Sequence, residues 1–182
     1  MLIHAEKSIV LVVDIQEKLT PKIHGHEQVV QQTAWLMDIA RILDIPVHAT
    51  EQYPRGLGPT VAALRDRLDA ERIHEKTAFG WPDRPEALEA LPRPQVVLTG
   101  IEAHICVLQS AIKLRLAGRD VFVVADAIGS RQPRDYDLAL HRLRQAGCWI
   151  VTREMVVFEW LEQANTDRFR DVLPHLKPHL RS

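Results

Sequence analysis

Asp14, Lys76 and Cys106 each follow a separate apolar segment of the chain. A carboxylate can act as a general base, an ammonium group can act as a fixed cation, and a cysteine sulfur can attack a carbonyl carbon. Taken singly, the three would be explained by a helix cap, a solvated surface charge and a small core side chain. Together they are the parts that a thiol hydrolase requires.

Cys106 lies at the start of an amphipathic stretch, directly behind an apolar run that ends at Thr99. The unpaired N–H groups at a helix N-terminus carry a partial positive charge, which favours thiolate over thiol in the first turn. The position of Cys106 therefore predicts a nucleophilic sulfur that is present as the thiolate.

Strands and helices that would position these residues alternate along the chain. Apolar, β-branched segments predict strands at 8–13, 46–50, 72–75, 95–99, 120–125 and 148–151. Amphipathic segments predict helices at 27–43, 60–68, 84–90, 104–117, 133–146, 155–161 and 167–173. Nearly continuous apolar strands separated by helices indicate an α/β fold, a doubly wound, Rossmann-like, mostly parallel six-stranded sheet with helices on both faces. In such sheets ligands bind beyond the carboxyl ends of the strands, which is where all three residues fall.

Length and charge limit the classes of partner. The 182 residues, 46% of them hydrophobic, are expected to form a single domain spanning 1–182. The net charge of −1 offers no field for a polyanion, so we expect a small-molecule substrate and neither nucleic acid nor membrane as a partner. Without a signal-peptide pattern or an apolar run of about 18 residues, the chain is expected to be cytoplasmic. Of the two cysteines, Cys148 is expected to be a core thiol.

Three segments resemble the motifs of one enzyme superfamily. Val13-Asp14-Ile15-Gln16, Glu75-Lys76-Thr77-Ala78-Phe79 and Thr99-Gly100-Ile101-Glu102-Ala103-His104-Ile105-Cys106-Val107 are similar, in order and spacing, to the Asp, Lys and Cys motifs of the isochorismatase-like (cysteine hydrolase) superfamily. The resemblance extends from about Ser8 to Val151. The segment from Thr50 to Gly58 resembles the isochorismatase domain-containing subgroup.

The resemblance implies a role for each motif residue. Asp14 would be the general base, Lys76 would hold the carboxylate and the sulfur in place, and Cys106 would attack the substrate carbonyl. The backbone N–H groups of Glu102 and Cys106 would form the oxyanion hole, together with a cis peptide bond before Glu102. Five residues are expected to contact the substrate, although turn or core packing is an equal alternative for most of them: Gln16, Gln52, Tyr53, Phe79 and Trp81.

Departures from other members of the superfamily narrow the chemistry. Nicotinamidases carry metal-binding histidines after the second strand, whereas residues 51–57 here contain none, so no metal and no cofactor are expected. Retention of Cys106 favours hydrolysis of a C–N bond in a small amide over cleavage of the vinyl ether of isochorismate. Two alternatives stay open: a binding or redox-sensing protein with a reactive thiol and no turnover, and a hydrolase of an isochorismate-like vinyl ether.

Secondary features concern the surface. His24 and His26 have a spacing that could chelate a metal, but a solvated loop or the start of a helix explains them better. Residues 125–131 are expected to form a turn at the C-terminal end of a strand, which contributes either to the pocket or to subunit contacts. His104 is expected at a pocket rim or an interface. Large apolar residues near the C-terminus predict a homo-oligomer interface at the sheet edge: Trp149, Val156, Val157, Phe158, Trp160 and Leu161.

Overall fold

The structure, a computed structural model, describes residues 1–177, so residues 178–182 of the predicted domain lie outside it. Within this range the strands form one six-stranded, all-parallel sheet in the order β3-β2-β1-β4-β5-β6. The strands are β1 (Ser8–Val13), β2 (Val47–Gln52), β3 (Ile73–Lys76), β4 (Gln95–Ile101), β5 (Asp120–Gly129) and β6 (Trp149–Val151). This topology confirms the predicted doubly wound α/β fold, and the strand order reverses between β1 and β4.

Helices follow the strands in the expected alternation. The α-helices are α1 (His26–Ile42), α2 (Pro54–Leu57), α3 (Ala62–Arg65), α4 (Leu108–Leu116), α5 (Pro133–Gln145), α6 (Arg153–Leu161) and α7 (Asp167–Leu176). A π-helical turn, Ala103–Val107, precedes α4, and 3₁₀ turns lie at Ala5–Lys7, Thr20–Lys22, Ala70–Arg72 and Pro85–Ala90. Of the helices in residues 1–177, not one has both the length and the apolar character needed to cross a bilayer.

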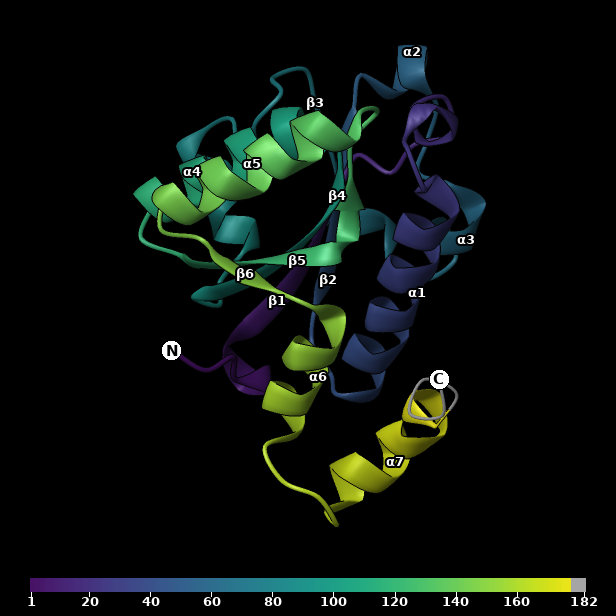
Figure 1. The fold of residues 1–182 in the computed structure, drawn as a ribbon, viewed down its shortest axis with the longest axis vertical. Coiled ribbons are helices and arrows are strands. Elements are labelled where there is room, and N and C mark those ends of the chain that lie inside the picture. Colours follow the sequence, from purple (N-terminus) through teal and green to yellow (C-terminus); the bar gives the residue numbers. More distant parts are fainter. Residues whose placement is uncertain (178–182) are drawn as a thin grey trace.

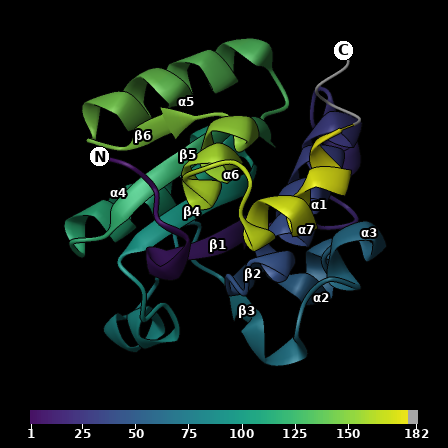
Figure 2. The same cartoon turned by 90° about the horizontal axis from the view of Figure 1, so that it is seen from below.

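The two faces of the sheet are covered by different helices, and each covered face is a separate part of the core. Helices α4 and α5 lie on one side of the sheet and α1 and α3 on the other (Figure 1). Seen from below, α7 lies beside α1 (Figure 2), where the Trp35 ring nitrogen donates to the backbone carbonyl of His175 at 3.0 Å. Successive β1 residues alternate between the faces: Val10 and Val12 pack toward α1, while Leu11 packs toward α4.

Two predicted helices differ from the structure, one in length and one in type. The prediction for 60–68 fails at its start because Thr60 forms an isolated bridge with Gln16, and its N–H and hydroxyl both donate to Glu51. The helix therefore begins only at Ala62. The prediction for 84–90 is wrong in type, since this segment is a 3₁₀ helix that begins with Pro85.

The predicted turn over 125–131 is wrong as well, because β5 continues to Gly129. The strand bulges on the way: Leu98 of β4 pairs with Val123, but Gly100 pairs with Ile128. The extra residues on β5 let the strand resume pairing beside the end of β4, next to the motif that carries Cys106.

The predicted C-terminal interface needs correction. Val156, Val157, Trp160 and Leu161 are buried in the core against α1, because α6 turns this face toward the sheet. Trp149 and Phe158 remain exposed, and Met155 joins them on the surface.

Candidate active site

Asp14 is held at the end of β1 in a buried, left-handed conformation. Its φ is 52°, its side chain has no exposed surface, and its backbone N–H donates to the carbonyl of Thr50 at 3.1 Å. The neighbouring strand β4 approaches closely at Gly100, where a Cβ would lie 2.2 Å from the carbonyl oxygen of Val13. Glycine at this position therefore lets the strand that leads to Cys106 run against the strand that ends in Asp14.

The Asp14 carboxylate has a partner on each oxygen. The Thr50 hydroxyl donates to Oδ1 at 2.7 Å and the Lys76 ammonium donates to Oδ2 at 2.6 Å. Both members of this ion pair are fully buried. A buried charge needs such a partner, because desolvation of an unpaired one is very costly.

Lys76 uses all three of its N–H donors within the protein. Besides Asp14, its ammonium group donates to the side-chain oxygen of Gln52 at 2.8 Å and to the carbonyl of Phe79 at 3.1 Å. A lysine ammonium has three donors and no acceptor, so this group is fully satisfied. Lys76 is therefore a fixed cation.

Gln16 and Gln52 form a buried brace behind the lysine. The Gln16 amide donates to the carbonyls of Gln52 and Gly58 at 3.0 and 2.6 Å and accepts from the Gln52 N–H at 2.7 Å. Gln52 in turn donates from its side chain to the carbonyl of Thr77 at 2.7 Å. Gln16 has no exposed surface, and these three hydrogen bonds make it a support for Gln52.

Cys106 lies within the π-helical turn and faces Asp14. Its thiol lies beside the Asp14 carboxylate, closely enough that each group shifts the pKa of the other, and the residue is only 7% exposed. The turn is closed by the Val107 N–H, which donates to the carbonyl of Glu102 at 3.2 Å. Such π-type turns often mark functional positions. The three residues predicted from their spacing are therefore brought together in space.

The expectation of a favoured thiolate is wrong for the free protein. Burial raises the pKa of Cys106 to about 12, the Asp14 charge adds to this rise, and Lys76 only partly opposes it. Burial likewise raises the pKa of Asp14, against the lowering effects of Lys76, Thr50 and Cys106. The helix terminus is outweighed by desolvation and by the neighbouring carboxylate, so the resting sulfur is a thiol.

The three aromatic residues predicted to contact substrate lie in different surroundings. Trp81 is buried and stacks on His74, with ring centroids 4.9 Å apart, and both rings border a hollow beside β3. Phe79 and Tyr53 are both 55% exposed. Phe79 is tied to the site by its carbonyl, which Lys76 contacts, and the Tyr53 N–H donates to the carbonyl of Lys76 at 2.8 Å.

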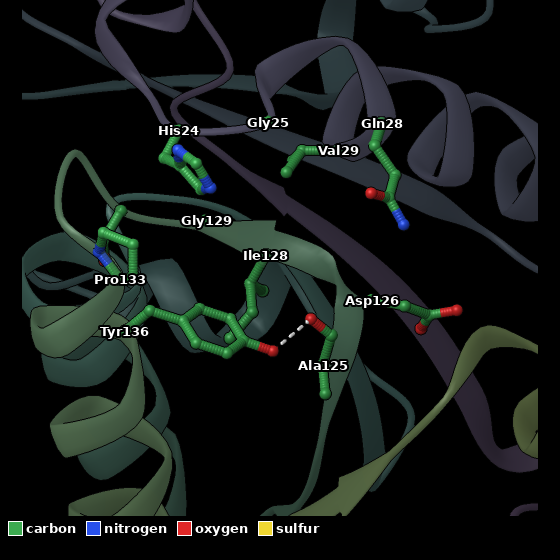
Figure 3. A pocket seen from close by; sticks show the side chains of 11 residues that line it. His24, Gly25, Gln28, Val29, Ala125, Asp126, Ile128, Gly129, Pro133 and Tyr136 are labelled. Atoms are coloured by element: carbon green, nitrogen blue, oxygen red, sulfur yellow. Dashed lines mark hydrogen bonds between the residues drawn. The ribbon is translucent and has the colours of Figure 1, made fainter.

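A separate pocket of about 270 Å³ opens between the start of α1 and the start of α5. Figure 3 shows His24 and Gln28 on one side of it and Tyr136 on the other. The Tyr136 hydroxyl donates to the carbonyl of Ala125 at 2.7 Å. The triad residues are absent from the lining of this pocket.

Glu51 and the two histidines that were considered for a metal lie in separate surroundings. Glu51 accepts two hydrogen bonds from Thr60, and His26 opens α1 while His24 lines the pocket of Figure 3. Among residues 1–177 no group of three or more His, Cys, Asp or Glu side chains is placed to hold a metal ion.

Several contacts around the triad were not predicted. Thr50 begins the segment from Thr50 to Gly58 that resembles the isochorismatase domain-containing subgroup. Its pairing with Val13 puts it beside Asp14, so the register of β1 and β2 would have indicated this contact. Glu102 accepts hydrogen bonds from Arg131, and His104 shares one with Ser130 at 2.9 Å. These contacts depend on the unexpected extension of β5. By contrast, the cis peptide bond expected before Glu102 is confirmed, since the peptide bond between Ile101 and Glu102 is cis.

Known proteins are similar to this chain in sequence and in fold. The family model described as "Isochorismatase domain" matches residues 8–155. "Isochorismatase domain-containing protein 2" of Danio rerio is 39% identical over 177 residues, covering 94% of this chain and 89% of the relative.

Solved structures agree with this assignment. The structure titled MAR1 ribonuclease from Caenorhabditis elegans is 35% identical, with a TM-score of 0.92 over 97% of this chain and 93% of that one. The YcaC gene product of Escherichia coli, titled an octameric hydrolase of unknown specificity, shares the fold with a TM-score of 0.91 at 23% identity, over 100% of this chain and 92% of that one. The chain therefore belongs to the isochorismatase family, in the isochorismatase domain-containing subgroup.

Proposed function

We propose that the protein is a cysteine hydrolase that cleaves a C–N bond of a small amide through a thioester intermediate. The observation that carries this proposal is the thiol of Cys106, placed beside a buried carboxylate that Lys76 and Thr50 hold by hydrogen bonds. A nucleophile in contact with a base, and a base oriented by a third group, is the arrangement used in nucleophilic catalysis.

The first step joins the sulfur to the substrate. Asp14 takes the Cys106 proton as the sulfur attacks the amide carbonyl, so the charge moves from the carboxylate toward the carbonyl oxygen. The backbone N–H groups of Glu102 and Cys106 would stabilise that oxygen. Because the thiol pKa is about 12, proton transfer must accompany or immediately precede attack.

The second half of the cycle releases the two products. Protonated Asp14 gives its proton to the leaving nitrogen, the C–N bond breaks, and an acyl thioester on Cys106 remains. Asp14, again a carboxylate, then takes a proton from a water molecule that attacks the thioester. The C–S bond breaks, Asp14 returns its proton to the departing sulfur, and the carboxylic acid leaves. Lys76 keeps the carboxylate oriented throughout and needs no proton transfer of its own.

The substrate would enter beside the loops that follow β2 and β3. Tyr53 and Phe79 have the exposed surface needed to contact a small molecule, and both are joined to Lys76 through backbone groups. Each step above uses only side chains and backbone groups of this chain, so the proposal includes no metal and no cofactor.

We also propose a homo-oligomer in the cytoplasm. The exposed residues Trp149, Met155 and Phe158 give the β6–α6 segment an apolar surface, and the E. coli neighbour is titled octameric. Both cysteines are free thiols, which suits a reducing compartment.

Two competing functions are less well supported. The C. elegans relative is titled a ribonuclease, but the net charge of −1 gives this chain no field to hold RNA. A redox sensor needs an accessible, low-pKa thiol, whereas Cys106 is buried with a pKa of about 12.

Ammonia or amine release from a panel of small amides tests the proposal. The wild type is expected to release amine from at least one member, with Cys106→Ala and Asp14→Asn reduced by about 10⁴-fold or more. A short RNA and a vinyl ether are assayed beside the amides. Cleavage of either of these that survives Cys106→Ala, with no amine released from any amide, would contradict the proposal.

A further inference from the structure

Two side-chain contacts fasten the nucleophile turn to the residues that follow β5. Glu102, directly before the turn, is bound by Arg131, and His104, inside the turn, is bound by Ser130. The two links sit on either side of Ala103, so together they fix the segment whose amides would face the substrate oxygen.

The Glu102 link is made by a single oxygen. Oε2 of Glu102 accepts from the Arg131 side chain at 2.9 Å and from the Arg131 backbone N–H at 3.1 Å. The Glu102 side chain is 11% exposed, while Arg131 is 55% exposed. An ion pair with one partner in solvent contributes little to stability, so the value of this pair lies in where it holds Glu102.

The residues that anchor the links are themselves fixed. Ser130 is 2% exposed, and its carbonyl accepts from the His24 N–H at 3.1 Å. Gly129 pairs with Ile101 of β4, and a Cβ on it would lie 2.7 Å from Ile23. The far ring nitrogen of His104 lies 3.8 Å from an Asp135 oxygen, which ties the same turn to α5.

We propose that Glu102 and Arg131, supported by His104 and Ser130, are positioning residues that hold the backbone amides of Glu102 and Cys106 where charge develops on the substrate oxygen. This inference rests on the proposed function, because it assigns that oxygen to those amides. A displacement of about 1 Å at such a site can reduce a rate by about 10²-fold.

Two thiol reagents separate this role from a general effect on Cys106. With acrylamide, Asp14 takes the thiol proton, sulfur bonds to the terminal CH₂, and the C=C electron pair moves so that negative charge develops on the amide oxygen. The α-carbon then takes the proton from Asp14. With iodoacetamide, sulfur displaces iodide, and the charge departs on iodide instead. Oxyanion stabilisation therefore accelerates the first reaction and not the second.

The experiment measures both alkylation rates by intact-protein mass in Glu102→Ala, Glu102→Gln and Arg131→Ala. Cys106→Ala reports background from Cys148. Asp38→Asn is the matched control, because it disrupts a comparable arginine–carboxylate pair, with Arg67, on the α1 side of the sheet. None of these measurements requires amide turnover, so failure of the proposed amidase activity and failure of this inference are distinguishable.

Glu102→Ala and Arg131→Ala are expected to slow acrylamide addition by about tenfold or more while iodoacetamide rates stay within about threefold of the wild type. Glu102→Gln keeps one side-chain oxygen for both Arg131 donors and is expected to retain most of the acrylamide rate, as is Asp38→Asn. Arg131 is exposed, so Arg131→Ala decides the question if Glu102→Ala does not fold. An unchanged ratio of the two rates in a folded Arg131→Ala protein would overturn the inference.

Discussion

At the scale of single residues, the protonation of Cys106 determines how the site works. A thiol with a pKa of about 12 reacts slowly until a base removes its proton, and Asp14, which lies beside it, is the base that we propose for this step. The buried sulfur is therefore expected to react slowly with electrophiles while it is protonated.

Asp14→Asn is predicted to make the thiol more acidic while abolishing turnover. Removing the carboxylate removes a charge that raises the Cys106 pKa and leaves the Lys76 charge that lowers it. The iodoacetamide rate at pH 7 is expected to rise about three- to fourfold for each unit by which the pKa falls, because the thiolate fraction grows while its nucleophilicity drops. A pH profile of alkylation measures this, and coincident profiles for the variant and the wild type would refute it.

Lys76→Met is predicted to destabilise the fold by about 3 to 5 kcal/mol, because it leaves the fully buried Asp14 carboxylate without its cation. Urea unfolding at pH 7 gives the change in free energy. The double variant Asp14→Asn/Lys76→Met is expected to recover part of the loss, since no charge is then left unpaired. A single variant as stable as the wild type would argue against the ion pair.

At the scale of elements, the carboxyl ends of β1, β3 and β4 explain why the triad could be predicted from the sequence. Residues that follow parallel strands must meet at one edge, so Asp14, Lys76 and Cys106 were expected to be neighbours. The brace of Gln16 and the protonation of Cys106 were not predictable, because both depend on side-chain directions and on the degree of burial. The Glu102–Arg131 contact depends on the bulge in β5, and the order of apolar and polar residues in the sequence does not indicate that bulge.

The adjacent strands β2 and β3 carry a histidine pair that predicts acid sensitivity. His48 Nδ1 and His74 Nε2 are 3.0 Å apart, and burial, His74 and Arg72 lower the pKa of His48 to about 4, against a raising effect of Asp69. From pH 6.5 down to 4 the unfolded chain binds more protons, so the stability held above pH 6.5 is lost as the pH falls. Unfolding free energies over this range should show a smaller slope in His48→Asn. An identical slope would exclude His48 as the source.

At the scale of the whole molecule, helices cover both faces of the sheet, and Trp149, Met155 and Phe158 stay exposed on the β6–α6 segment. Most of the C-terminal apolar residues turned out to pack inside, because α6 lies against the sheet beside α1. Sequence composition alone could not separate the inward residues from the three that stay outside.

Self-association through this surface is predicted to depend on Met155 and Phe158. These residues lie three apart on α6 and are 53% and 42% exposed. Met155→Lys combined with Phe158→Lys is expected to lower the oligomer mass measured by light scattering, without loss of helical signal. The control is Leu116→Lys, an equally apolar exposed position on α4. A mass that stays the same in the double variant would place the interface elsewhere.

The central claim, covalent catalysis by Cys106, is tested most directly by trapping the acyl-enzyme. An amide that yields amine is mixed with the protein, the reaction is stopped in acid within one turnover, and the protein mass is measured. We predict a gain equal to the acyl group, located on Cys106, in the wild type and none in Cys106→Ala. Amine release with no adduct, at a rate that Cys106→Ala retains, would contradict the account.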